Sequence, residues 1–168
     1  MQDTIDAQLD DVDLAVAAYR RAGEWVVDEL TLEHCEDVET LAEALRHLGG
    51  DAGAIALVSI DEDFFVIVRV QGPRTRVLLS DASAAEDWDL AESVLDLLDE
   101  IDPDDLDERD EDEPAGDLAL LADLGVAEEV MEELLDDVDL YPDEVLSDLA
   151  RLMGFGELFD DVVGLTSA

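Results

Sequence analysis

Lysine is missing from this sequence of 168 residues, whose cationic side chains, apart from two histidines, are eight arginines. They are outnumbered by 49 aspartates and glutamates, which gives a formal net charge of -41 at pH 7. A surface this negative is repelled by phosphate backbones and by anionic membranes. We therefore expect no direct contact with nucleic acid or with a membrane, and we expect attraction to basic proteins or cations.

Cysteine and long apolar runs are scarce as well. Cys35 is the single cysteine, so no disulfide can form within the chain. No apolar run reaches the roughly 18 residues that a membrane-spanning helix needs. The first residues, Met1 to Asp6, lack the basic and then apolar pattern of a secretory signal. These absences predict a cytoplasmic protein.

The motifs of several enzyme classes are also absent. A phosphate-binding P-loop needs a lysine, and neither Gly-x-Ser-x-Gly nor Gly-x-Gly-x-x-Gly occurs. His34-Cys35-Glu36 matches the His-x-Glu segment of zinc deaminases, but the segment that supplies two cysteines is missing. The aspartates between 102 and 112 are dense but do not have EF-hand spacing. We therefore expect no catalytic residues, no cofactor and no metal site.

Apolar residues are plentiful, at 48% of the chain, which is too many for a disordered acidic tail. Their spacing predicts an N-terminal sheet domain over residues 1–98, with the expected helix at 38–48 capped by Asp37. The expected order β-β-α-β-β-β-α is similar to that of longin-like and profilin-like domains and predicts an α+β fold with an antiparallel sheet. The expected strands lie at 14–20, 24–30, 54–60, 64–71 and 75–80, and the second helix at 84–98.

The second half of the chain has a different pattern. Residues 99–113 hold 11 acids in 15 positions, and like charges at this density predict an extended linker, which we place at 99–116. Residues 117–168 show helical spacing with Pro142 at a helix start and Gly154 at a helix end. Such a small helical domain buries little apolar area by itself, so we expect it to pack on the sheet or on a partner.

Two groups of residues are candidates for interaction. Arg69, Arg74 and Arg76 form the main basic cluster and could hold a phosphate or carboxylate ligand, the chain's own carboxylates, or the acidic linker. Phe155 and Phe159 belong to the last apolar cluster. They would either enter the intramolecular core or form a contact with a partner or a second copy.

Three stretches resemble the tRNA adenosine deaminase-associated proteins of high-GC Gram-positive bacteria. They are Phe64–Val70 running on to Arg76–Ala82, Pro114–Val126, and Leu152–Gly156. The resemblance covers most of residues 14–163 together with the acidic linker. It implies a partner, a tRNA adenosine deaminase, and it offers no known activity and no catalytic residues to carry over to this chain.

The sequence therefore predicts a non-catalytic acidic module that binds a basic protein, as a regulator or as a mimic of nucleic acid. Two alternatives stay open. One is a structural subunit that assembles with itself and whose charge provides only solubility. The other is an enzyme that uses carboxylates or a bound metal.

Overall fold

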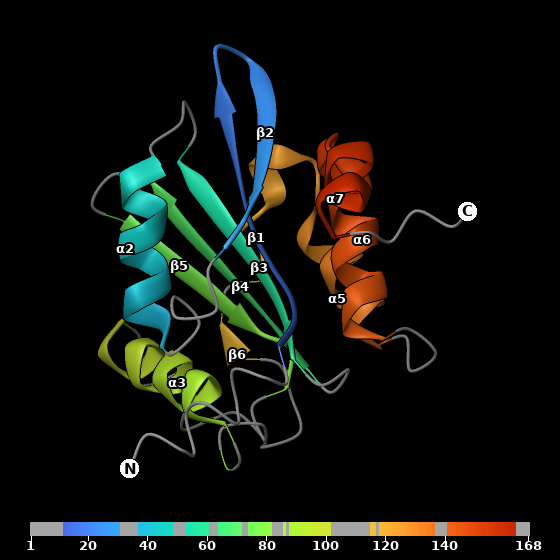
Figure 1. Cartoon of the computed structure of the whole chain (residues 1–168). Coiled ribbons are helices and arrows are strands. Elements are labelled where there is room, and N and C mark those ends of the chain that lie inside the picture. The colour runs from blue at the N-terminus through green and yellow to red at the C-terminus, as the bar shows by residue number, and fades with distance from the viewer. Residues whose placement is uncertain are drawn as a thin grey trace.

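A six-stranded antiparallel sheet forms the centre of the protein, with strand order β2-β1-β3-β4-β5-β6. Helices cover both of its faces (Figure 1), so the α+β fold with an antiparallel sheet is confirmed. The computed structural model describes residues 12–30, 37–48, 53–60, 64–71, 74–81, 86, 88–101, 115–116, 118–136 and 141–163.

The strands agree closely with the sequence pattern, because turn residues separate them. Their bounds are β1 Val12–Arg21, β2 Glu24–Glu29, β3 Ala54–Ile60, β4 Phe64–Gln71, β5 Arg74–Leu79 and β6 Ala115–Gly116. The short strand β6 was not expected. It lies in the segment that we assigned to the linker and pairs with the end of β5.

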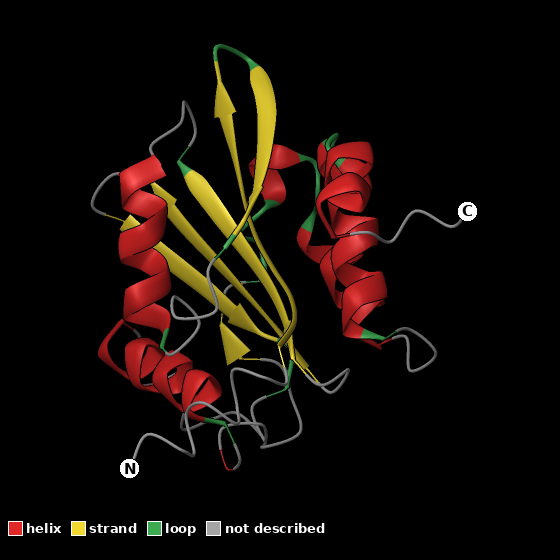
Figure 2. Cartoon of the chain, in the orientation of Figure 1, coloured by secondary structure: helices red, strands yellow, loops and turns green. Residues whose placement is uncertain are grey.

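The helices form two layers, as Figure 2 shows. One layer holds α2 and α3, and the other holds α5, α6 and α7 with the short 3₁₀ helix η3. Their bounds are α2 Val38–Leu48, α3 Asp89–Ile101, η3 Ala122–Leu124, α5 Glu128–Asp136, α6 Pro142–Met153 and α7 Gly156–Val163.

Two helical segments differ from expectation. α3 begins at Asp89, and the acids of its first turn, Asp89 and Glu92, favour a helix start at this point. Residues 118–121 form turns that lead into η3, although they lie in the segment whose helical spacing predicted α-helix. Residues 102–114, most of the expected linker, lie outside the described residues.

The central strands are buried on both faces, which explains why they read as continuous apolar runs. Successive residues of β3 point to opposite sides of the sheet. Val58 packs in the cluster that contains Leu41 of α2, whereas Leu57 packs in the cluster that contains Phe159 of α7. The C-terminal helices therefore pack on the sheet, which is one of the two placements that the sequence left open.

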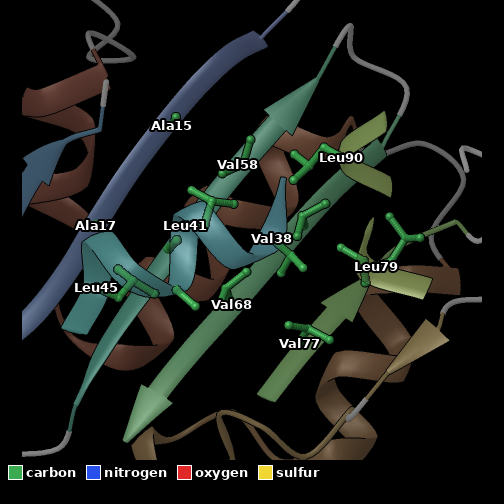
Figure 3. Packing of buried hydrophobic residues seen from close by; sticks show 14 of the residues in the cluster. Ala15, Ala17, Val38, Leu41, Leu45, Val58, Val68, Val77, Leu79 and Leu90 are labelled. Carbon is green, nitrogen blue, oxygen red and sulfur yellow. The ribbon is translucent and has the colours of Figure 1, made fainter. Parts of the chain in front are cut away.

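The first layer packs on the sheet through an apolar core. Leu41 and Leu45 of α2 lie over Val58 and Val68 (Figure 3). The Asp37 carboxylate accepts a hydrogen bond from the Thr40 backbone N–H at 2.7 Å, so the expected cap is confirmed.

The second layer is joined to the first hairpin through Trp25. Its ring lies 4.6 Å from that of Phe155, and its indole Nε1 donates a hydrogen bond to the Met153 carbonyl at 3.1 Å. This carbonyl lies at the end of α6, where helix carbonyls lack intrahelical partners. Gly154 follows with φ +106°, and Pro142 stands in the first turn of α6, so both expected helix boundaries are confirmed.

The hairpin between β1 and β2 contains a strained residue. Ala22 has φ +56° and Gly23 has φ +83°, the left-handed pair that a two-residue hairpin turn requires. Replacing Ala22 by Asn should raise the free energy of unfolding by about 1 kcal/mol, because Asn tolerates this conformation better than Ala. Urea denaturation measures the change. Gly23→Ala is the matched control and should lower stability; equal effects of both variants would contradict the turn geometry.

Phe159 should be a major contributor to stability. Its side chain is 0% exposed, whereas the neighbouring Leu158 is 41% exposed. Phe159→Ala should cost about 3–5 kcal/mol of unfolding free energy, since it leaves a cavity against the sheet. Leu158→Ala on the same helix should cost less than about 0.5 kcal/mol. Equal melting temperatures for the two variants would mean that α7 does not pack as described.

Candidate functional site

The strand register brings the three arginines of the basic cluster to one corner of the sheet. Arg69 on β4 lies directly opposite Arg76 on β5, and Arg74 lies opposite Gln71. All three arginines are on the face that the C-terminal helices cover, because they alternate with residues of the other core. Like charges directly opposite each other destabilise a sheet, so this corner needs an acid.

Asp123 of η3 supplies that acid. Nη1 and Nη2 of Arg69 donate to both carboxylate oxygens of Asp123, with 2.8 Å between Nη2 and Oδ2, and Nη1 also donates to the Leu120 carbonyl at 2.7 Å. The Arg69 side chain is 0% exposed, whereas that of Asp123 is 56% exposed. Arg69 thus anchors the turn that leads into the C-terminal helices.

The electrostatics of this pair follow from its geometry. The hydrogen bonds from Arg69 are the largest influence on the Asp123 carboxyl, and they hold its pKa below its ordinary value. The charges of Arg69 and Arg76 lower the pKa further, against an opposing effect of burial. Asp123 therefore stays ionised, and its negative charge offsets the repulsion between Arg69 and Arg76.

Two further arginines near this corner make hydrogen bonds. Arg76 donates to the Gln71 side chain at 2.6 Å, and Arg46, which belongs to α2 on the opposite face of the sheet, donates to the Thr75 hydroxyl at 3.0 Å. Arg74 is exposed at the start of β5. Of the roles that the sequence left open for the cluster, Arg69 has the intramolecular one, an ion pair with the chain's own carboxylate.

Phe155 and Phe159 do not form a surface. They are 1% and 0% exposed, and both pack in the core between the C-terminal helices and the sheet. As candidate contact residues they require a correction, since their rings touch neighbouring side chains of the same chain and leave no area for a partner.

The outer side of the C-terminal helices is a broad acidic surface, which we call the acidic helix face. Most apolar residues of these helices point inward, so the acids that alternate with them at helical spacing point to solvent. Arg151 is the arginine in these helices and pairs with Asp148. The exposed or half-exposed acids are Glu128, Glu129, Glu132, Glu133, Asp136, Asp143, Glu144, Asp148, Glu157, Asp160 and Asp161.

Large apolar side chains are exposed in the same part of the chain. Tyr141 is 56% exposed, Leu152 47% and Leu158 41%. Single exposed apolar residues are common on protein surfaces. Together with the acids, they give this layer both charge and apolar contact area.

Within the described ranges, no three His, Cys, Asp or Glu side chains are grouped so that they could hold a metal ion. The same ranges contain no helix that is long and apolar enough to cross a bilayer. His34, Cys35 and the dense aspartates from 102 to 112 lie outside the described residues.

The residue pattern of this chain matches a family model over residues 13–156, described as Rv3753c-like tRNA adenosine deaminase-associated protein. The chain belongs to this family. It is also 43% identical to "Protein Rv3753c" of Mycobacterium tuberculosis (strain ATCC 25618 / H37Rv) over 149 residues, which cover 88% of this chain and 86% of that protein. No solved structure matches the chain. The family resemblance noted in the sequence is confirmed.

Asp123→Asn should destabilise the protein by about 1–2 kcal/mol near neutral pH, because the buried Arg69 charge loses its counter-ion while solvent around the half-exposed carboxylate screens part of the interaction. The folded-state pKa of Asp123 is depressed, so the ion pair contributes fully above the unfolded pKa and is lost as pH falls through the folded pKa. The stability difference between wild type and variant should therefore shrink below about pH 4. Urea denaturation across pH measures it, with Glu128→Gln as the exposed control.

Proposed function

We propose that this protein is a non-catalytic accessory protein that binds a tRNA adenosine deaminase in the cytoplasm and contacts it through the acidic helix face. Membership of a family named for association with that enzyme supports the choice of partner. The observation that carries the binding mode is the concentration of exposed acids on α5, α6 and α7.

Charge explains why these two proteins would associate. An enzyme that acts on tRNA presents a positive surface to the phosphate backbone. The acidic helix face is complementary to such a surface, which speeds association and makes it sensitive to salt. Tyr141, Leu152 and Leu158 add exposed apolar area on the same layer. Binding to tRNA itself is disfavoured by the net charge of -41.

Two modes of action fit this surface. As a nucleic-acid mimic, the protein would cover the tRNA groove and compete with tRNA. As a supporting subunit, it would bind elsewhere and leave tRNA affinity unchanged. A competition titration with tRNA distinguishes them. Assembly of two copies through the acidic helix face is opposed by like charge.

Calorimetric titration with the tRNA adenosine deaminase of the same cell tests the proposal. We expect micromolar or tighter binding that weakens as salt rises, because screening reduces attraction between charged surfaces. Changing Glu128, Glu129, Glu132 and Glu133 of α5 to Gln should weaken binding by about tenfold or more and flatten the salt dependence.

A matched control removes the same number of charges from the opposite layer. Its exposed acids Glu39, Glu43, Glu92 and Asp96 lie on α2 and α3, and we change them to the corresponding amides. This control should bind the deaminase nearly as the wild type does. Equal loss in both variants would make the effect one of net charge and reject the acidic helix face, and no heat in any buffer would reject the partnership.

A further inference from the structure

The strand β2 is an outer strand of the sheet, and among the described residues no strand pairs with its outer side. It has six residues, whereas β6 at the other edge has two. The β1–β2 hairpin extends beyond the rest of the sheet, as Figure 1 shows. An edge of this length presents a row of backbone groups that can pair with another chain.

The pairing with β1 identifies the outward backbone groups. The Leu30 N–H donates to the Ala15 carbonyl at 2.9 Å, so Leu30 points its backbone toward β1. In an antiparallel ladder, hydrogen-bonding residues alternate with residues whose backbone points the other way. Trp25, Val27 and Glu29 therefore direct their N–H and C=O groups outward.

This edge is held in place by contacts on its inner side. Trp25 is fixed by its contact with Phe155 and its hydrogen bond to Met153, and Val27 is 8% exposed in the core. A preformed edge loses little conformational entropy when a second strand pairs with it.

The charges beside this edge favour one kind of occupant. Glu24, Asp28 and Glu29 are all exposed. Two of these acids have polar neighbours within the hairpin. Arg21 lies opposite Glu24, and the Tyr19 hydroxyl donates to Asp28 at 3.2 Å. A second copy of β2 would place acids against acids, which is destabilising. An extended segment rich in Arg or Lys would place opposite charges there.

We propose that the outer edge of β2 binds an extended basic segment of a partner protein as an additional strand. The backbone of Trp25, Val27 and Glu29 provides the hydrogen bonds, and Glu24, Asp28 and Glu29 select for basic side chains. For the identity of the partner, this inference rests on the function proposed above. The docking site itself is inferred from the edge position and backbone directions of β2.

A synthetic octapeptide of alternating Arg and Val, capped at both ends, is the probe for this site. Amide hydrogen exchange by NMR gives a direct readout at each backbone group. The peptide should slow exchange at the outward amides of Trp25, Val27 and Glu29 by about tenfold or more, and it should change Val26 and Asp28 little, since they already pair with β1. The same peptide methylated on every backbone nitrogen keeps its charge and should protect none of them.

Two variants separate the backbone from the charge. Glu29→Pro removes one outward N–H without removing a hydrogen bond of the β1–β2 ladder, which edge strands tolerate, and it should raise the peptide Kd by about tenfold. Glu29→Gln keeps the donor, so it should raise the Kd only a few-fold and reduce the salt dependence. Circular dichroism and thermal midpoints check that both variants fold.

The outcomes for the site and for the proposed function are distinguishable. Peptide binding without protection of the three outward amides, or no peptide binding at all, would overturn the docking site. If the deaminase binds the wild type and Glu29→Pro equally well, the edge is not where that partner docks. If the peptide protects the edge but the deaminase does not bind, the docking site is supported and the proposed function fails.

Discussion

A sheet that is apolar on both faces is the constraint on which the rest of this structure depends. Every residue of β3 is buried, so a single helical layer cannot cover both of its faces. α2 and α3 cover one face, and the other face requires α5, α6 and α7, which the chain supplies after a long acidic segment. The Arg69–Asp123 pair and the Trp25–Met153 hydrogen bond fix the position of this second layer. Each of these contacts joins the sheet to residues late in the sequence.

The separation of apolar and acidic residues gives the protein its surface. Helix α5 illustrates it, because Met131 is buried whereas Glu128, Glu129, Glu132 and Glu133 are exposed. Burial of apolar area offsets the repulsion among like charges that this arrangement creates. The same helices therefore hold the fold together on their inner side and carry the exposed negative charge of this layer on their outer side.

The sequence predicted the strands and most helices well, since local signals such as the Asp37 cap, Pro142 and Gly154 mark their ends. Long-range geometry was not predictable. Arg69 was identified as a candidate, but its partner Asp123 is 54 residues away and is brought near only by packing. Phe155 and Phe159 could be core or surface, because periodicity shows which residues share a face and does not show what covers it. The open edge of β2 was missed for the same reason, since strand order is a tertiary property.

The Trp25–Met153 hydrogen bond spans 128 residues of sequence, and this separation bears on how the chain folds as it is synthesised. The first hairpin is synthesised well before the helices that cover its inner face. Contacts between residues so far apart slow folding, and an uncovered apolar face makes a nascent chain prone to aggregate. The abundant acids would repel neighbouring chains during that interval. The same net charge of -41 that marks the folded protein would then keep incomplete chains apart.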